Sequence, residues 1–348
     1  MSGKRDQSVS VARGIAICCM VVGHTFFDSW TGAIYFWHMP LFFFFSGYFF
    51  DHEKYGARQF LYRKIKTLYW PFVAWQLTAL ALHNTLVSIH ISPPPTYDLG
   101  DYVAKSFVTV FQMTYAGEDF LGTFWFLSTL FAVNIIAYVV SVLVSPIWGE
   151  RRRWLLWLLL AVAFLMTALV CNRLGLSPRG RGYITWLTLA FFFCGKLAIG
   201  GRMRSWKLCV VCLLIASPQY PFSRIEMLDL RWQQVVPYFV FALCGIVIVY
   251  NISVLICNRS SVPARVLAYI GNRSLAIMIL HFICFRIVTL ARIAVDPSLT
   301  INNLSDHPMP PDSAIPWRMA YIVMGIGLPL LIDTAYRKAK GAIMIKRQ

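Results

Sequence analysis

Long apolar runs alternate with short polar stretches along the whole chain. Most runs approach the roughly 20 residues with which a helix, rising about 1.5 Å per residue, crosses about 30 Å of hydrocarbon. The pattern predicts an all-α, polytopic transmembrane helix bundle in a single domain over 1–348, with no additional soluble domain. About ten spans are expected, the seventh of which is too short to cross alone: 9–27, 34–50, 67–90, 123–146, 154–172, 183–199, 208–217, 233–257, 266–291 and 317–336.

Composition and charge support a membrane protein. Hydrophobic residues make up 58% of the chain and charged residues 14%, against about 45–50% and about 25% in soluble domains. A net charge of +17 would suit a nucleic-acid partner, but most of the basic residues fall into the segments on one side of the predicted topology. This positive-inside bias places both termini in the cytoplasm and makes membrane lipid, not nucleic acid, the expected surroundings.

The first predicted span carries ionisable residues at both ends. Arg13 and His24 are eleven residues apart, close to three helical turns, so they share a helix face. Asp28 follows His24 at i+4, within reach of the imidazole. A carboxylate beside a histidine fixes its tautomer and raises its basicity, which suits a general base. The alternative is that Arg13 snorkels to the inner headgroups and His24 pairs with a neighbouring helix.

The second predicted span begins with an aromatic stretch that contains His38. A short loop joins spans one and two, so His24 and His38 are expected at similar depth near the outer boundary. Pro40 removes a backbone donor, and Ser46 with Gly47 permits close helix approach. His38 is also consistent with an interfacial residue in an aromatic belt.

Two further basic segments have both a functional and a purely structural or topological interpretation. Arg63 and Lys66, at i and i+3 before span three, face one way and resemble a phosphate cradle, although spacing alone favours topogenic charge. Arg273, His281 and Arg286 lie in span nine, with Arg273 and His281 two turns apart on similar faces. Ionisable residues inside a span are costly and are functional candidates by default. No spacing predicts a metal site, and no glycine-rich motif predicts a bound cofactor.

Several of these segments together resemble the acyltransferase 3 family of integral membrane acyltransferases. "RGIAICCMVVGHT" is similar to its first helix, with Arg13 and His24 matched, and "FWHMPLFFFFSGYFF" resembles its second-helix signature. "RKIKTLYWP" is similar to an Arg-x-x-Arg stretch before a proline, with Lys66 in place of the second arginine. "GTFWFLSTLF" matches a Trp-Phe-Leu segment at Trp125, and "IGNRSLAIMILH" matches a late Gly-x-x-Ser helix that ends on His281.

The resemblance implies a sugar O-acetyltransferase reaction. Cytoplasmic acyl-CoA, usually acetyl-CoA, gives its acyl group to a hydroxyl of a cell-surface, exported or lipid-linked glycan, at the cell inner membrane and with polysaccharide biosynthesis or export machinery as possible partners. The expected roles divide into three sets: His24, Asp28 and His38 for catalysis; Arg13, Arg63 and Lys66 for acyl-CoA; and Ser46, Glu118, Asp119, Trp125, Arg273 and His281 for acceptor binding or support.

Two mechanisms and two other functions stay open from the sequence. His24 acts as general base with Asp28 as its orienting partner, or a histidine carries the acyl group across the membrane, with His38 as partner in either route. A proton-coupled or anion transporter using Arg13, His24 and His281 is the main alternative, although no internal repeat supports it. A receptor or a structural membrane protein is the second and weaker alternative function.

Overall fold

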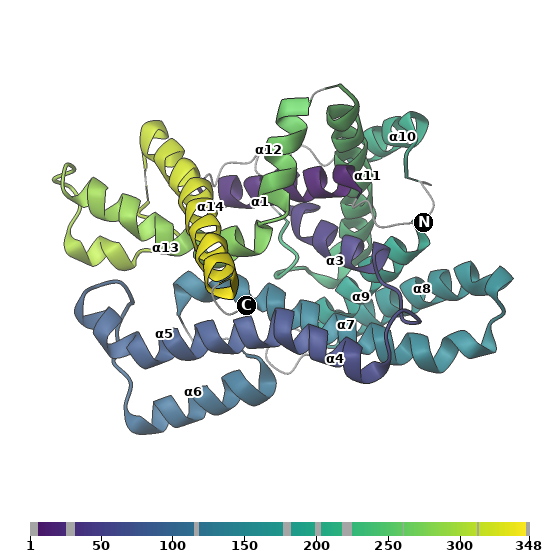
Figure 1. Cartoon of the computed structure of the whole chain (residues 1–348), viewed down its shortest axis with the longest axis horizontal. Helices are drawn as coiled ribbons and strands as arrows, with labels where there is room; N and C mark the ends of the chain where they lie inside the picture. The colour runs from purple at the N-terminus through teal and green to yellow at the C-terminus, as the bar shows by residue number, and fades with distance from the viewer. Residues whose placement is uncertain are drawn as a thin grey trace. The chain divides into compact units, whose positions relative to one another are not determined.

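The computed structural model describes residues 6–25, 32–114, 118–176, 182–198, 203–217, 225–259, 261–311 and 313–345, with side chains up to Gly341. Every regular element in these ranges is helical, as Figure 1 shows. The α-helices are α1 (Gln7–Thr25), α2 (Gly32–Tyr35), α3 (His38–Tyr48), α4 (Ala57–Lys64), α5 (Trp70–Ser88), α6 (Leu99–Gln112), α7 (Trp125–Val144), α8 (Arg153–Arg173), α9 (Gly182–Leu197), α10 (Trp206–Ala216), α11 (Val235–Arg259), α12 (Ser261–Gly271), α13 (Ser274–Ile293) and α14 (Ile315–Ile345). Shorter 3₁₀ or π segments are η2 (Ile65–Tyr69), η3 (Asp119–Phe124), η4 (Ser145–Ile147), η5 (Glu150–Arg152), η8 (Trp232–Gln234) and η9 (Ile301–Ser305).

The predicted all-α transmembrane class is confirmed, but ten spans are not. Among the described residues, six helical segments are long and apolar enough to cross a membrane: Gln7–Thr25, Asp119–Ile147, Glu150–Arg173, Trp232–Arg259, Ser274–Ile293 and Ile315–Gly341. Helices α9 and α10 are apolar but shorter. The orientation of the termini stays a prediction.

Two of the predicted spans are wrong as single helices. The span over 34–50 divides into α2 and the eleven-residue α3, because Pro40 suits only the first turn of a helix and the chain restarts just before it. The span over 266–291 divides at Asn272 and Arg273, between α12 and α13. Glycine and asparagine are weak helix formers, and the sequence Gly-Asn at this point ends the first helix.

The chain forms two compact units. Unit 1 comprises Met1–Met20, Phe27–Leu68 and Thr129–Gly271, and unit 2 comprises Val21–Phe26, Tyr69–Ser128 and Asn272–Gln348. Helix α1 therefore contributes its first turns to unit 1 and its last turn to unit 2.

Unit 1 is built on close helix packing. Helix α9 packs against both α3 and α8, and α11 packs against α10 and α3. A Cβ atom on Gly47 would lie 1.7 Å from the Phe192 carbonyl oxygen, and one on Gly195 would lie 1.8 Å from that of Phe44. Helices α3 and α9 thus touch backbone to backbone, an approach that small residues permit in membranes.

Unit 2 joins helices to loops. Helix α13 packs along α14 (Figure 1) and against η3 and η9, and α5 packs against α6. The carboxylate of Asp98 caps α6 by accepting from the Asp101 backbone N–H at 2.8 Å. The Thr123 hydroxyl donates to the Met278 carbonyl oxygen at 3.0 Å and so ties η3 to α13.

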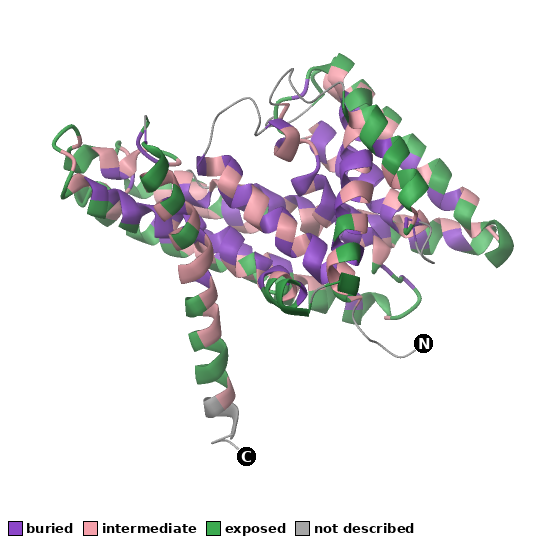
Figure 2. Cartoon of the chain, turned by 90° about the horizontal axis from the view of Figure 1, so that it is seen from above, coloured by how far each residue is buried: buried purple, intermediate pink, exposed green. Residues whose placement is uncertain are grey.

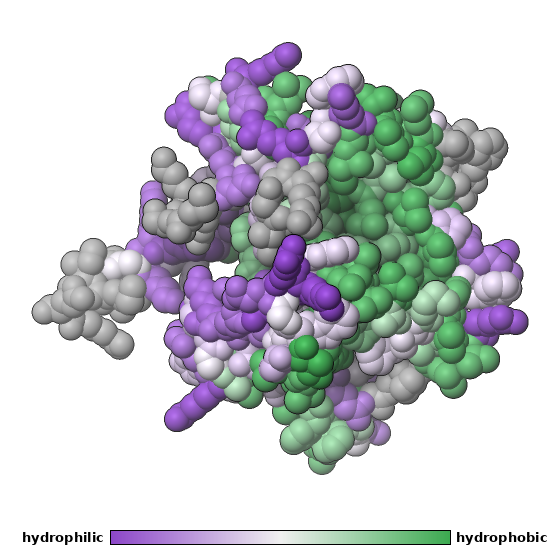
Figure 3. Space-filling view, turned by 90° about the vertical axis from the view of Figure 1, so that its right-hand side faces the viewer, coloured by the Kyte–Doolittle hydropathy of each residue, from purple (hydrophilic) through white to green (hydrophobic). Residues whose placement is uncertain are grey.

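The exposed surface of several helices is apolar. Figure 3 shows a broad hydrophobic area on the side where α8 and α10 lie in Figure 1. Exposed side chains that contribute to such surfaces include Leu159, Val162 and Met166 of α8 and Val211 and Leu214 of α10. An area of this kind is unsuited to water and suits contact with lipid. In Figure 2, by contrast, the end of α14 near the C-terminus is exposed and rich in polar residues.

Candidate functional site

Two histidines from distant parts of the sequence meet in unit 2. His24, in the last turn of α1, stacks on His281 of α13 with ring centroids 5.4 Å apart and an angle of 24° between the rings. Phe282 packs against both histidines, with its ring centroid 4.8 Å from that of His24 and 4.0 Å from that of His281. Each histidine was predicted separately from the sequence, but helical spacing within one span gives no indication that they are neighbours.

Backbone carbonyl groups fix the tautomer of His281. Its Nδ1 lies 3.0 Å from the carbonyl oxygens of both Ile277 and Met278. Because a carbonyl oxygen only accepts, Nδ1 carries the proton and Nε2 carries the lone pair. The His281 side chain is fully buried, and its Nε2 has no hydrogen-bond partner among the described residues. This nitrogen is therefore oriented as a base or nucleophile.

Thr123 supports the same arrangement. Its hydroxyl donates to the Met278 carbonyl oxygen, which is one of the two oxygens that face His281 Nδ1. Trp125, predicted as a support residue, begins α7 just after η3 and is 9% exposed. The Trp-Phe-Leu segment thus anchors the end of η3 in the hydrophobic core, close to Thr123, which contacts α13.

Charged residues lie beside the pair. His307, which the sequence did not single out, contacts Phe282 edge to face with ring centroids 4.5 Å apart. Asp119 and Arg286 interact electrostatically with His307 and with each other. The predicted acceptor residue Asp119 is therefore placed in the same neighbourhood as Phe282, and through it as His24 and His281.

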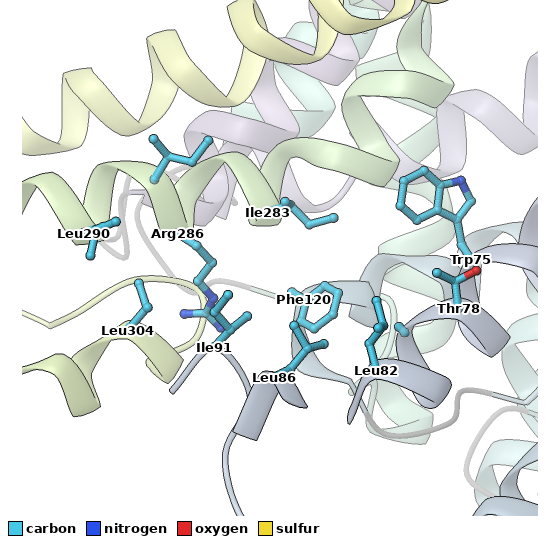
Figure 4. Close-up of a pocket in the computed structure, with 12 residues that line it drawn as sticks. Trp75, Thr78, Leu82, Leu86, Ile91, Phe120, Ile283, Arg286, Leu290 and Leu304 are labelled. Carbon is cyan, nitrogen blue, oxygen red and sulfur yellow. The ribbon is translucent and has the colours of Figure 1, made fainter. Parts of the chain in front are cut away.

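A cavity of about 330 Å³ lies in unit 2, between α5 and α13. Figure 4 shows the side chains that line it. Its walls are mainly apolar, including Leu82, Phe120 and Ile287, and Arg286 is the charged residue among the described lining residues. Arg286 donates through Nη2 to the Ser305 carbonyl oxygen at 3.2 Å and through Nη1 to that of Asp306. Its Nε has no partner among the described residues. The cavity can hold an apolar chain with a hydrogen-bond acceptor near Arg286.

Glu118 is a buried anchor in unit 2. Its side chain is 1% exposed, and its carboxylate faces His83 Nδ1 on one oxygen and accepts from the Ser92 hydroxyl at 2.6 Å on the other. His83 Nε2 lies 3.0 Å from the Pro95 carbonyl oxygen, and its ring stacks on Tyr97 at 3.5 Å. Both carboxylate oxygens are thus occupied by the 89–98 loop and α5, which fits support and not contact with an acceptor.

Arg273 forms an ion pair at the start of α13. Its Nε lies 3.2 Å from an Asp333 carboxylate oxygen on α14. The same carboxylate accepts from Arg337 Nε at 2.6 Å. Arg273 therefore links α13 to α14 within unit 2, and its role in acceptor binding or support stays a prediction.

The remaining predicted residues that the structure describes belong to unit 1. The Arg13 guanidinium lies 5.9 Å from the Phe42 ring centroid, and His38 Nδ1 lies 2.8 Å from the Ile34 carbonyl oxygen. Ser46 and Asn134 exchange hydrogen bonds at 3.3 and 3.4 Å. Asp28 lies outside the described residues, so its predicted contact with His24 stays a prediction. The predicted facing of His24 and His38 also stays a prediction, because the two belong to different units.

Arg63 and Lys66 lie over different aromatic rings of unit 1. The Arg63 guanidinium is 4.5 Å from the Tyr55 ring centroid, whereas Lys66 Nζ is 6.0 Å from that of Tyr62. Between them the helix changes to the π form of η2, which has more residues per turn than an α-helix. Their joint action on one phosphate stays a prediction.

Comparison with known proteins identifies one family. The acyltransferase 3 family, described as an acyltransferase domain, matches residues 6–334, nearly the whole chain. No curated protein and no solved structure gives a significant match.

Proposed function

The chain belongs to the acyltransferase 3 family, and from that premise we propose that it transfers an acyl group from acyl-CoA to a saccharide hydroxyl. The group is acetyl in the simplest case, and the acceptor is a cell-surface, exported or lipid-linked glycan. The apolar cavity beside Arg286 favours an acceptor that carries a lipid. Multi-pass residence in the cell inner membrane, alongside polysaccharide biosynthesis or export machinery, is part of the same proposal.

The stacked pair His24 and His281 is the observation that carries this function. One imidazole, His281, has its proton held on Nδ1 by backbone carbonyls and its Nε2 unpartnered among the described residues. A buried, oriented imidazole of this kind is what acyl transfer to a hydroxyl requires, because the hydroxyl must lose its proton as it attacks.

Two routes are consistent with the pair. In the first, a histidine takes the proton of the acceptor hydroxyl, the hydroxyl oxygen attacks the thioester carbonyl, the C–S bond breaks, and the CoA thiolate receives the proton. In the second, an imidazole nitrogen displaces the CoA thiolate and holds the acyl group until the hydroxyl takes it. In the first route the hydroxyl proton thus ends on the CoA sulfur. In the second route the CoA thiolate takes the proton released by the acylated imidazole, and the hydroxyl later returns its own proton to the ring nitrogen, so the products of both routes are the ester and the CoA thiol. Asp28 would orient His24, with His38 as a further partner.

The donor is assigned to the predicted cytoplasmic ends of the helices. Arg13, Arg63 and Lys66 would contact the CoA phosphates there, although Lys66 offers a point charge where arginine would offer a bidentate fork. Asp119 and His307, near Phe282, would contact acceptor hydroxyls on the opposite side.

Matched substitutions of three histidines test the proposal. His24→Asn and His281→Asn should each lower acyl transfer from radiolabelled acetyl-CoA to glycan by roughly 10²–10⁴-fold, the usual contribution of a positioned base. His90→Asn is the control, because His90 is exposed at φ 59°, a backbone conformation that asparagine also adopts. Near-normal transfer by both site variants, in protein present at the normal membrane level, would remove the pair from the mechanism.

The sidedness is tested with single cysteines in a background without the nine native ones. Lys54→Cys should resist an impermeant thiol reagent in intact cells, and Asn302→Cys should react. Labelling of position 54 instead would invert the topology and place the histidines on the donor side. The family match favours transfer over transport, and a wild-type protein that moves protons or anions without transferring acyl groups would support the transporter instead.

A further inference from the structure

The turn that joins α3 to α4 in unit 1, residues 50–56, gathers basic side chains from three helices. Lys196 reaches it from the end of α9, Arg153 from the start of α8, and Arg63 from α4. We call these residues with His52 the 50–56 turn cluster. The predicted topology places this end of each helix on the cytoplasmic side.

Lys196 is fixed in the cluster by contacts that use only part of its hydrogen-bonding capacity. Its Nζ donates to the Phe50 carbonyl oxygen at 2.5 Å, and it lies 5.7 Å from the Phe50 ring centroid and 5.9 Å from that of Trp157. An ammonium group has three N–H donors. The two aromatic faces stabilise the charge and leave the remaining N–H groups for an acceptor.

His52 and Arg153 each have a buried nitrogen with no hydrogen-bond partner among the described residues. His52 is 8% exposed; its Nε2 is 2.9 Å from the Ser145 hydroxyl, and its Nδ1 is unpartnered. Arg153 contacts Glu53 through Nη1 at 2.9 Å, and its buried Nε is unpartnered. A buried polar group without a partner is costly. Arg153 Nε can only donate and so requires an acceptor oxygen, whereas His52 Nδ1 donates in the tautomer whose Nε2 accepts from the Ser145 hydroxyl.

Arg63 brings the sequence-predicted phosphate residue to the same turn. Its guanidinium lies over Tyr55 at 4.5 Å, and the Tyr55 carbonyl oxygen accepts from the Tyr138 hydroxyl at 3.3 Å. The turn and the cluster together carry two carboxylates, Asp51 and Glu53, and four cations: Lys54, Arg63, Arg153 and Lys196. The net charge of these residues is positive, and the unpartnered Arg153 nitrogen can act only as a hydrogen-bond donor. Both features fit an anionic oxygen ligand.

We propose that the 50–56 turn cluster binds a phosphate group of the acyl-CoA donor, through Lys196 and Arg153, with His52 as a third contact. This inference rests on the proposed function, which supplies acyl-CoA as the donor. It adds a binding site to the arginines that the sequence singled out, and it places the phosphate-bearing part of the donor on α8 and α9 as well as on α4.

The test compares a donor that carries phosphates with one that lacks them. Lys196→Gln and Arg153→Gln should each raise the KM for acetyl-CoA by about tenfold or more, as loss of a charge-assisted hydrogen bond implies. Neither should change the KM for S-acetyl-pantetheine, which has no phosphate. Lys196→Arg should restore most of the affinity. Arg259→Gln, which removes an exposed charge at the end of α11 in the same unit, is the control and should change neither KM.

Equilibrium binding of radiolabelled CoA separates this inference from the proposed function. Wild-type protein that binds CoA more tightly than both variants, yet transfers no acyl group, would retain the site and refute the function. Wild-type protein that fails to bind CoA would overturn the site. Equal KM values for acetyl-CoA in wild type and both variants would also overturn it. Arg153 is partly exposed, so its variant keeps the test valid if Lys196→Gln does not fold.

Discussion

The main contacts between helices within unit 1 differ from those within unit 2. In unit 1, glycines let helix backbones touch, as at Gly47 against Phe192 and Gly195 against Phe44. In unit 2, buried ionisable side chains join helices to loops, as Glu118 does with His83 and Ser92 and Arg286 does with η9. Close backbone contact packs helices firmly without burying polar side chains. Buried polar side chains lower stability unless they are paired, but they can also act as acids, bases or ligands. The histidine pair lies in the unit that already depends on such groups.

The largest loss of stability is expected from Glu118→Ala in unit 2. The change leaves His83 and Ser92 without their buried partner, and breaking a buried ion pair costs about 3–5 kcal/mol. Thermal unfolding of the purified protein should shift to lower temperature, and limited proteolysis should begin in the 89–98 loop. Glu150→Ala, at an exposed glutamate, is the control. Unchanged unfolding would show that the anchor contributes nothing to unit 2.

The close approach in unit 1 predicts the next effect. Gly47→Ala places a Cβ 1.7 Å from the Phe192 carbonyl oxygen, so α3 and α9 must separate at a cost of about 1–3 kcal/mol. The midpoint of thermal unfolding should fall. Gly327→Ala adds the same methyl group within α14, where no atom lies within 4 Å, and should leave stability unchanged or improved. Equal behaviour of the two variants would contradict backbone contact as the basis of unit 1.

A smaller effect concerns the polar contact inside unit 1. A double-mutant cycle of Ser46→Ala and Asn134→Ala should give a coupling energy of about 0.6 kcal/mol, as for hydrogen bonds between membrane helices. Denaturant unfolding measures the four stabilities. Thr167→Ala removes a hydroxyl that donates locally to the Ala163 carbonyl oxygen, and it should show no coupling to Asn134→Ala. Coupling as large as the Glu118 loss would remove the contrast between the units.

The smallest effect is a pH dependence of stability from His52. Burial lowers the pKa of His52 below its ordinary 6.5, with Lys196 and Arg153 adding to the shift and Glu53 and Asp51 opposing it. Above pH 6.5 the ring is neutral in both states and contributes nothing. Below it the unfolded chain takes up a proton that the folded chain does not, so the free energy of unfolding falls as pH falls. His52→Gln should flatten that fall, as measured by thermal unfolding on either side of pH 6.5.

The sequence predicted the helical class and singled out His24 and His281, but it did not predict that the two are neighbours. His24 and His281 stood out because ionisable residues in apolar spans are costly. Their contact depends on how α1 and α13 pack, and residues so far apart in sequence carry no periodic signal for it. The same cost argument applied to His83, inside an apolar helix, would have identified the partner of Glu118. His307 carried no signal, since it lies in a loop of ordinary polar composition.

The number of spans was predicted less well, for local reasons. Hydropathy adds up the apolar residues on both sides of a break, so 34–50 and 266–291 each resembled one crossing. Pro40 and the Gly-Asn step before Arg273 were the signals against continuity. The unpartnered nitrogens of His52 and Arg153 follow from the packing of separate helices, which periodicity within one helix does not show.

The length of α14 has a consequence for the membrane boundary. Its 31 residues span roughly 46 Å at about 1.5 Å per residue, against a hydrocarbon thickness of about 30 Å. A helix longer than the hydrocarbon layer tilts or lets one end emerge from it. The exposed stretch with Arg337, Lys338 and Lys340 is the end suited to emerge, as a basic rod among anionic lipid headgroups. Lipid charge then becomes a determinant of how deeply the helix is seated.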